Sequence, residues 1–242
     1  MTSPQSVASK LYDGPGFRRF GIDTVVKFGG SLLFDVKVAT EVAAMLAGLP
    51  AEQTVLVFPG GGPTDKLIES ISRELDFDGP TRNPACMRAL DQTGILLAAM
   101  HPRLSAVEDL ASARHELARG QVPVLLPGRL ILALDVFTRE DVITSDSLGA
   151  FFAFLVGAKR YVVLTNVDGV YDSVTGPADD RRLIEKISAE ELAVRGPTSV
   201  DRCLAPFLRT VRMPTWVLDG RVPSRVAELL SGGTPIGTQI DA

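Results

Sequence analysis

The chain has 242 residues, of which 45% are hydrophobic and 22% are charged. This length suits one large domain or two lobes, and the composition is that of an ordered globular protein, which excludes a disordered chain. The formal net charge of −4 produces no field that would attract nucleic acid or an anionic membrane surface. We therefore expect neither a nucleic acid nor a membrane as a partner.

Cysteine usage and the lack of long apolar runs narrow the class further. Cys86 and Cys203 are the only cysteines and lie outside any metal-binding spacing, so we expect free thiols and no structural zinc site. No apolar run reaches the roughly 18 residues that a membrane helix needs. The N-terminal segment lacks the apolar stretch of a signal peptide. We expect a cytoplasmic protein with a flexible arm over residues 1–22.

The first regular element predicted is a strand over residues 24–28, which leads through a Gly-Gly-Ser turn at residues 29–31 into a helix over residues 36–46. Glycine has no Cβ, so backbone N–H groups in such a turn can approach an anion closely. Lys27, at the end of the strand, adds a positive charge. We predict an anion site here, although the spacing is not that of a Walker A loop.

The same pattern follows once more. A strand over residues 54–58 ends in three consecutive glycines at residues 60–62, and a helix over residues 64–75 follows. A tight turn rarely needs three glycines, so we predict that a ligand approaches the backbone at this turn.

The middle of the chain is predicted as a loop over residues 78–84 and a helix over residues 85–100. Arg88 and Asp91 lie on or beside one face of this helix, where they contact an acceptor or form the solvent-facing side, and both interpretations stay open. The predicted elements that follow are a helix over 104–117, a strand over 122–126, and a strand or hairpin formed by 130–136 with 142–143.

The most informative stretch covers residues 144–172. It reads as a polar turn, an apolar helix over 148–156, a buried strand over 161–164 and a polar loop over 165–172 that contains glycine. Open α/β sheets bind ligands at the carboxyl ends of their buried parallel strands. We therefore predict that a nucleotide binds at the loop over residues 165–172.

Strands and helices continue to alternate to the end of the chain. Ser188 and Glu191 form the pattern of a capping box at a helix start. The remaining predicted elements are a surface loop over 173–182, a short strand and helix within 183–192, a helix over 203–212, a strand over 215–218, a helix over 222–230 and a strand over 236–240. This alternation predicts an α/β fold, a three-layer α/β/α sandwich with a mainly parallel central sheet.

Four motifs in this order resemble the amino acid kinase superfamily, which includes acetylglutamate, aspartate, uridylate and isopentenyl phosphate kinases. They are KFGGS at residues 27–31, GGG at 60–62, TSDSL at 144–148 and LTNVDGVYD at 164–172. Within the superfamily, residues 196–232 resemble most closely the kinases of methanofuran biosynthesis, which phosphorylate an aminomethylfuran-methyl phosphate. The subunits of the molybdenum storage protein are more distantly similar.

The resemblance implies ATP and Mg²⁺ as cofactors and a role for each motif. Lys27 would hold the transferred phosphoryl group, and Asp146 would orient Lys27 or hold Mg²⁺. Gly29, Gly30 and Ser31 would bind nucleotide phosphates. The residues that would complete the ATP site are Thr165, Asn166, Asp168, Gly169, Tyr171 and Asp172. The residues that would bind the acceptor are Gly60, Gly61, Gly62, Arg88, Asp91, Ser145 and Asp201.

One departure from the family pattern concerns a second lysine that many members carry after the NVDG loop. Lys186 is the only lysine between residues 172 and 242, and it does not stand in that context. Arg202, Arg209 or Mg²⁺ would then supply the charge, and we assign the catalytic role to Arg202. A phosphate acceptor is already an anion near neutral pH, so no catalytic histidine is needed, and we expect His101 and His115 at the surface.

The leading hypothesis is a kinase that converts [5-(aminomethyl)furan-3-yl]methyl phosphate into its diphosphate. The alternatives are a kinase for another small acceptor, such as uridine monophosphate, isopentenyl phosphate or an amino-acid carboxylate; an ATP-binding protein that stores molybdenum or other oxyanions; and a regulator that binds ATP without transfer. The resemblance also implies a homo-oligomer, a dimer or hexamer, with an acceptor lobe over about 23–140 and a nucleotide lobe over about 141–242.

Overall fold

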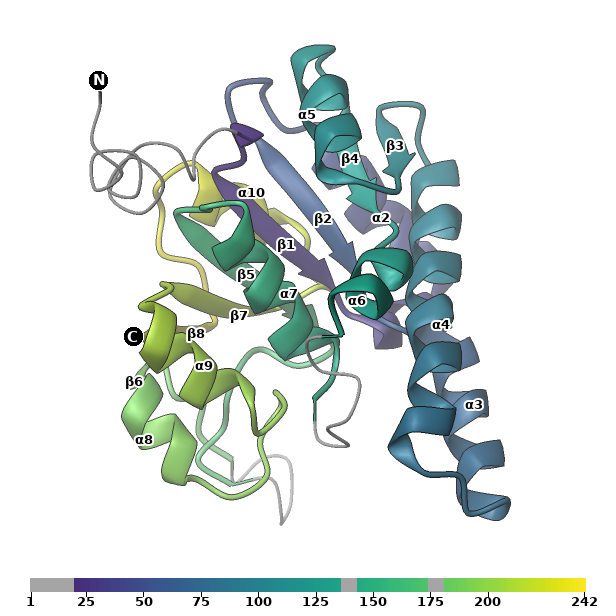
Figure 1. Ribbon diagram of the computed structural model, residues 1–242. Coiled ribbons are helices and arrows are strands. Elements are labelled where there is room, and N and C mark those ends of the chain that lie inside the picture. The colour runs from purple at the N-terminus through teal and green to yellow at the C-terminus, as the bar shows by residue number, and fades with distance from the viewer. Residues whose placement is uncertain (1–19, 136–142, 174–180) are drawn as a thin grey trace, which may run out of the picture.

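A computed structural model describes residues 20–135, 143–173 and 181–242 (Figure 1). Its centre is a sheet of eight strands in the order β3-β4-β2-β1-β5-β7-β8-β6. Neighbouring strands run parallel except for β7 and β8, which pair antiparallel. The strands are β1 (Thr24–Phe28), β2 (Val55–Pro59), β3 (Leu104–Val107), β4 (Val122–Leu125), β5 (Arg160–Thr165), β6 (Lys186–Ser188), β7 (Thr215–Asp219) and β8 (Thr238–Asp241).

Helices cover both faces of this sheet, so the predicted three-layer α/β/α sandwich is confirmed (Figure 1). One face carries α5 (Leu110–Ala118), α6 (Gly128–Leu134), α7 (Ser145–Leu155), α8 (Ala189–Val194) and α9 (Leu204–Val211). The other face carries the short 3₁₀ helix η2 (Gly30–Phe34), α2 (Val36–Ala47) and α10 (Ser224–Leu230). The helices α3 (Gly62–Glu74) and α4 (Gly79–Ala99) lie side by side at one edge of the molecule.

The alternation of side chains along β1 decides what faces α7. Val25 packs in the core under α7, whereas Val26 and Phe28 pack in the core on the opposite face of the sheet. Side chains alternate between the two faces of a strand, so Lys27 shares the face of Val25. Only 7% of Lys27 is exposed. The sheet therefore directs a nearly buried ammonium group toward α7.

The predicted loop over residues 78–84 is wrong, because α4 already begins at Gly79. Asp78 caps this helix by accepting the N–H of Thr81 at 2.9 Å. Pro80 stands in the first turn, where a missing N–H costs no intrahelical hydrogen bond. The prolines that resembled loop residues in the sequence therefore lie at the start of a long helix.

Two further predictions from the middle of the chain are also wrong. The predicted helix over residues 104–117 is the strand β3 followed by α5, which Asp109 caps by accepting the N–H of Ser112 at 2.8 Å. The predicted strand or hairpin from residue 130 is the helix α6, which ends at Asp135 in a left-handed conformation. Residues 136–142 of that prediction lie outside the described residues.

The remaining expectations fall partly outside the described residues. Residues 1–19 of the expected arm and 174–180 of the expected surface loop are not among them. Ile22, near the end of the expected arm, is 3% exposed and packs in the core under α7. The predicted capping box is confirmed, since the Ser188 hydroxyl and the Glu191 N–H are 3.1 Å apart and the reciprocal bond is present. Within the described segments, no helix is both long and apolar enough to cross a membrane.

Candidate functional site

A buried ion pair lies at the carboxyl end of β1. The Nζ atom of Lys27 is 2.6 Å from Oδ1 of Asp146, which stands in the first turn of α7. Both residues are 7% exposed. The second carboxylate oxygen of Asp146 accepts the N–H of Asp201 at 3.2 Å. A buried charge pair is tolerated when its remaining atoms are hydrogen-bonded, so this arrangement holds a cation in one fixed place.

Asp201 joins the starts of two helices beside this ion pair. Its carboxylate accepts hydrogen bonds from donors at the start of α7 and at the start of α9. These donors are the N–H groups of Thr144 (3.1 Å), Ser147 (3.0 Å), Cys203 (2.9 Å) and Leu204 (3.0 Å) and the hydroxyls of Thr144 (2.9 Å) and Ser147. The oxygens of Asp201, which the sequence analysis assigned to the acceptor, are therefore already occupied by donors of the protein itself.

Tyr161 holds the main chain of Asp146 in place through a hydrogen bond. Its hydroxyl donates to the main-chain carbonyl of Asp146 at 2.8 Å, and its ring is fully buried in β5. Burial, together with the negative charges of Asp146 and Asp201, raises the pKa of Tyr161 well above its usual value, so the hydroxyl stays a donor. Sequence reasoning missed this residue, because an apolar strand with one tyrosine resembles any core strand.

The two glycine-rich turns touch each other next to Lys27. A Cβ on Gly30 would overlap the backbone nitrogen of Gly62. Gly62 itself has a φ of +64°, in the left-handed region that favours glycine. The N–H of Gly60 donates to the carbonyl of Phe28 at 2.8 Å and ties the second turn to the first. Backbone atoms of the two turns meet directly at this contact, which is the kind of surface that binds phosphate oxygens.

The loop over residues 165–172 follows β5 at the same edge of the sheet. Asp168 accepts hydrogen bonds from Arg225 at 2.6 Å and from the Tyr171 hydroxyl at 2.8 Å. These bonds, that of Arg225 first, hold the pKa of Asp168 below its usual value, while burial and Asp168 raise the pKa of Tyr171. Asn166 and Asp172 are exposed. The loop therefore has an ordered anchor at Asp168 and open polar groups around it.

The connection between β7 and α10 adds residues that sequence reasoning missed. Gly220 donates its N–H to the carbonyl of Thr165 at 2.8 Å, which brings this connection beside the loop. The carboxylate of Asp219, at the end of β7, binds Arg221 through Nε (3.0 Å) and Nη2 (2.7 Å). Asp219 raises the pKa of Arg221. The available signal was the Asp-Gly-Arg sequence after a strand, which resembles an ordinary turn.

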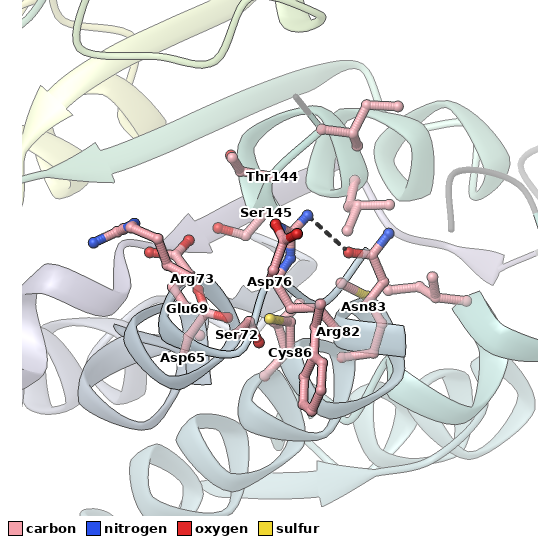
Figure 2. Close-up of a pocket in the computed structure, with 17 residues that line it drawn as sticks. Asp65, Glu69, Ser72, Arg73, Asp76, Arg82, Asn83, Cys86, Thr144 and Ser145 are labelled. Atoms are coloured by element: carbon pink, nitrogen blue, oxygen red, sulfur yellow. Dashed lines mark hydrogen bonds between the residues drawn. The ribbon is translucent and has the colours of Figure 1, made fainter. Parts of the chain in front are cut away.

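A cleft of about 450 Å³ opens between the triple-glycine turn and the start of α7. Figure 2 shows Asp65, Glu69, Ser72, Arg73 and Asp76 along its α3 side, with Thr144 and Ser145 opposite. Among the predicted acceptor residues, Gly61 and Ser145 line this cleft. Its other lining residues are Phe77, Arg82, Asn83, Cys86, Met87, Leu90, Ile131, Ile143 and Leu148.

Arg88 and Asp91 lie outside the cleft. Arg88 forms an exposed ion pair with Asp91 at 3.3 Å, and Asp91 accepts the N–H of Gly128 at 2.7 Å. This second bond ties α4 to the start of α6. The structure thus gives Asp91 a packing partner and places Arg88 at the surface, which matches the alternative that the helix pattern had left open.

The remaining predicted cations lie on either side of the start of α9. Arg202 is exposed in the turn before α9 and directly follows Asp201, whose N–H donates to Asp146 at 3.2 Å. Arg209 is also exposed and stands in the last turn of α9. Of the two, Arg202 is therefore the one that adjoins, in sequence, a residue bonded to Asp146.

The two free thiols and the exposure of His115 agree with the expectations, whereas His101 is less exposed than expected. Cys86 is a buried free thiol and Cys203 a partly buried one. His115 is exposed, and His101 is half-buried with its Nδ1 accepting the N–H of Arg103 at 3.1 Å. Among the described residues, no group of three or more His, Cys, Asp or Glu side chains gathers in a way that would hold a metal ion.

Comparison with known proteins adds relatives of this chain. The sequence profile of the amino acid kinase family matches residues 24–219. The chain is 28% identical to the [5-(aminomethyl)furan-3-yl]methyl phosphate kinase of Methanocaldococcus jannaschii, over 89% of this chain and 96% of the relative. It is 29% identical to the uridylate kinase of Haloarcula marismortui, over 89% and 97% of the two chains. The crystal structure of the uridylate kinase from Archaeoglobus fulgidus shares the fold, with a TM-score of 0.71 at 23% identity over 90% of this chain and 100% of that one.

Proposed function

Because this chain belongs to the amino acid kinase family and is an ATP-dependent phosphotransferase, we propose that it phosphorylates a small acceptor that already carries a phosphate. The acceptor we favour is [5-(aminomethyl)furan-3-yl]methyl phosphate, which the name of the Methanocaldococcus jannaschii relative gives as the substrate of that protein. The observation that carries the proposal is the cleft between the triple-glycine turn and the start of α7, the helix whose Asp146 binds Lys27. Its volume of about 450 Å³ suits a small molecule, and its wall combines arginines, carboxylates and apolar side chains.

Phosphoryl transfer needs positioning and charge compensation more than covalent help from the protein. Lys27, held by Asp146 at 2.6 Å, would bind the oxygens of the transferred group. Backbone N–H groups of Gly29, Gly30 and Ser31 would bind the nucleotide phosphates. The backbone N–H groups of Gly60, Gly61 and Gly62 would face the acceptor phosphate. An oxygen of that phosphate attacks the terminal phosphorus of ATP, and ADP leaves, so no base is required.

Mg²⁺ would neutralise charge on the nucleotide phosphates during this transfer. Asp146 is the carboxylate we propose for it: each of its oxygens accepts one bond, from Lys27 and from the N–H of Asp201, and keeps a further lone pair for a cation that is otherwise bound by water. Arg202 is the residue we propose in place of the family's second lysine. It directly follows Asp201, whose N–H donates to the carboxylate of Asp146 at 3.2 Å. A guanidinium binds phosphate readily, though with a different geometry from an ammonium.

The ATP site we propose is the edge formed by the carboxyl ends of β1, β5 and β7. It comprises Thr165, Asn166, Asp168, Gly169, Tyr171 and Asp172, and we add Arg221 and Arg225. The strand order supports a division into an acceptor lobe (residues 23–140) and a nucleotide lobe (141–242), because β1 to β4 occupy one half of the sheet and β5 to β8 the other. Since ATP is the donor, we expect the protein to act in the cytoplasm.

A uridylate kinase is the second candidate, and the 29% identity to the Haloarcula marismortui enzyme favours it. The test is ADP release with Mg-ATP and a panel of acceptors: the aminomethylfuran phosphate, uridine monophosphate, isopentenyl phosphate, acetylglutamate and none. Phosphorus NMR would identify a P–O–P product. Turnover with the furan phosphate is the expected result. Turnover only with uridine monophosphate would replace the proposal with the second candidate, and ATP binding without turnover on any acceptor would contradict both.

We also propose a homo-oligomer that assembles through α3. Leu67, Ile71 and Leu75 form an apolar stripe at helical spacing, and they are 61%, 45% and 58% exposed. Exposed apolar stripes of this kind mark interaction surfaces. Light scattering should show a dimer or larger assembly that Ile71→Asp dissociates. Val194→Asp is the control, because Val194 is 84% exposed and lies on α8. A monomeric wild-type protein would contradict the proposal.

A further inference from the structure

The helix α3 presents a charged stripe to the cleft. Asp65, Glu69, Ser72, Arg73 and Asp76 recur at the spacing of one helix face and its C-terminal extension, and all five line the cleft (Figure 2). Three carboxylates thus stand against one guanidinium on this wall. The proposed acceptor carries a phosphate anion, and such a wall would repel an acceptor that carried nothing else.

Asp65 lies beside the turn at which the acceptor phosphate is expected. Its Oδ2 atom is 2.6 Å from the position that a Cβ on Gly61 would take, so the carboxylate packs directly against the triple-glycine turn. Only glycine at residue 61 leaves room for it. Asp65 therefore belongs to the end of the cleft next to the reacting groups and not to its outer rim.

The cations near the carboxylate of Asp65 in the described part of the chain, Lys66 and Arg82, act on it only at longer range than a salt bridge. Among the described residues Asp65 forms no ion pair, and the adjacent Lys66 pairs with Glu69 at 2.8 Å instead. The Cys86 thiol donates a weak hydrogen bond to it, and burial raises the pKa of Asp65. A partly buried carboxylate without a counter-ion is costly, which makes it a site that a cationic ligand would stabilise.

The chemistry of the surroundings indicates which kind of cation. A divalent cation coordinated by protein side chains alone would need several oxygen ligands, and no group of three or more potential metal-ligating side chains gathers in the described part of the chain. An ammonium group needs only one or two acceptors. The apolar part of the cleft wall, formed by Met87, Leu90, Ile131 and Leu148, would pack against a flat ring.

We propose that Asp65 is the specificity-determining residue of the acceptor site and that it binds a protonated amine on the acceptor. The phosphate end then faces the triple-glycine turn and Lys27, and the ring lies along the apolar wall. This inference rests on the proposed function and deepens it, because it defines the acceptor class as a zwitterion, an amine-bearing phosphomonoester. A nucleoside monophosphate, which carries no cation, would be a poor acceptor.

The test compares two acceptors that differ only in the amine. They are [5-(aminomethyl)furan-3-yl]methyl phosphate and its analogue with a methyl group in place of the aminomethyl group. The value of kcat/KM is measured for both with the wild-type protein, with Asp65→Asn and with Glu74→Gln. Glu74→Gln is the matched control, because Glu74 loses the same charge on the same helix, is exposed and does not line the cleft.

The wild-type protein should prefer the amine by about tenfold to a hundredfold, which is the range for a hydrogen bond to a charged group. In Asp65→Asn this preference should fall to near one, through a higher KM for the amine. Glu74→Gln should keep the wild-type preference. Asn has nearly the shape of Asp and can still accept the Cys86 bond, and a thermal melt would verify the fold.

The outcomes separate this inference from the proposed function. If the wild-type protein uses the furan phosphate but Asp65→Asn loses activity equally with both acceptors, the function stands and Asp65 is not the amine site. If the wild-type protein shows no preference for the amine, the inference is likewise wrong. If only uridine monophosphate is phosphorylated, the proposed acceptor and the amine site are both wrong.

Discussion

Two regions of the molecule differ in how their charged side chains are paired. One is the edge of the sheet that we assign to ATP, and the other is the acceptor cleft. At the edge, charged side chains are paired within the protein: Asp168 with Arg225 at 2.6 Å, and Asp219 with Arg221 at 2.7 Å. In the cleft, Asp65, Arg73 and Asp76 form no ion pair among the described residues. The first region is organised before any ligand binds, whereas the second leaves charge available to its ligand.

This difference follows from the elements that build each region. The edge consists of strand ends, short turns and the start of α10, whose backbones are fixed by the sheet, so Asp219 pairs with Arg221 two residues on and Asp168 with Arg225 across the edge. The cleft lies between the helices α3 and α4 and the start of α7, so its side chains project into open space. Preorganised groups suit a ligand that is the same throughout a kinase family, and open charges suit the ligand that distinguishes one member from another.

Removal of the charge on Lys27 should have the largest effect on the shared region. Lys27→Met takes away the cation proposed for the transferred phosphoryl group and leaves Asp146 buried without its partner. We expect kcat to fall by about 10²- to 10³-fold, the range for loss of one preorganised group that stabilises a transition state. Steady-state kinetics would measure it, together with a thermal melt to follow the effect on the fold.

The matched control for this prediction is Lys159→Met. Lys159 pairs with Asp23 at 2.9 Å, but its side chain is 47% exposed. Exposed pairs contribute about 0.2–1 kcal/mol at most, so kcat should be unchanged and the melting temperature nearly so. Comparable losses of kcat in the two variants would contradict the role of Lys27.

Asp201→Asn should have the next largest effect, because Asp201 positions Asp146 rather than the ligand. The amide would place two N–H groups among six donors of the protein, and the free energy of unfolding should fall by about 3 kcal/mol. For a chain of this size the melting temperature would drop by roughly 6–12 °C. The start of α7 would shift, and kcat should decrease by about ten- to a hundredfold.

A control for this variant is Asp241→Asn, whose exposed pair with Lys186 at 2.7 Å should contribute little. Calorimetry of the two variants gives the comparison. If Asp201→Asn melted like the wild-type protein and only KM for the acceptor rose, Asp201 would contact the acceptor, as the family resemblance had implied.

Two further substitutions should have smaller effects, each on the KM of a different substrate. Arg225→Ala breaks the bond to Asp168 at the proposed ATP edge, and Arg73→Ala removes a guanidinium that lines the cleft. We expect Arg225→Ala to raise KM for ATP about two- to fivefold and Arg73→Ala to raise KM for the acceptor by a similar factor, as suits partly exposed charges. A rise in the same KM for both variants would show that the two regions do not act separately.

The sequence predicted the fold and the ion-pair region well for a physical reason. The glycine turns, Lys27 and the loop after β5 are local motifs at strand ends, and a parallel sheet brings strand ends to one edge. Asp146 stands in the first turn of α7, and the family resemblance was what linked it to Lys27. The same rule could not reveal Tyr161, whose role depends on the carbonyl of a residue fifteen positions away. It also could not show that the oxygens of Asp201 are occupied.

The acceptor cleft was the region that the sequence predicted least well. Arg88 and Asp91 were considered because they share a helix face, but only three-dimensional packing shows that this face contacts α6. Because residues 78–84 were predicted as a loop, the start of α4 was missed. Arg82, which lies in this part of α4 and lines the cleft, was missed with it. Side chains from the four helices α3, α4, α6 and α7 meet in this cleft, and no local sequence pattern indicates that they do.

Titration should distinguish the two regions by a smaller but more specific effect. Burial raises the pKa of Asp65, and Arg225 and Tyr171 lower the pKa of Asp168. The groups that face Asp65 are Lys66 and Glu69 on α3 and Arg82 and Cys86 on α4. As the pH falls, Asp65 therefore takes up a proton before Asp168 does, and the proposed amine site loses its charge first.

The quantity to measure is the ratio of kcat/KM for the amine-bearing furan phosphate to that for its methyl analogue. The phosphate groups of the two acceptors titrate alike, so the ratio removes their contribution. As the pH is lowered we expect the wild-type ratio to fall, because burial makes Asp65 protonate at a higher pH than an ordinary aspartate, whose pKa is about 3.9. KM for ATP should not follow it, since Asp168 keeps its charge and its bond to Arg225 to a lower pH. The ratio for Asp65→Asn should be constant, and an equal fall in that variant would assign the titration to another group.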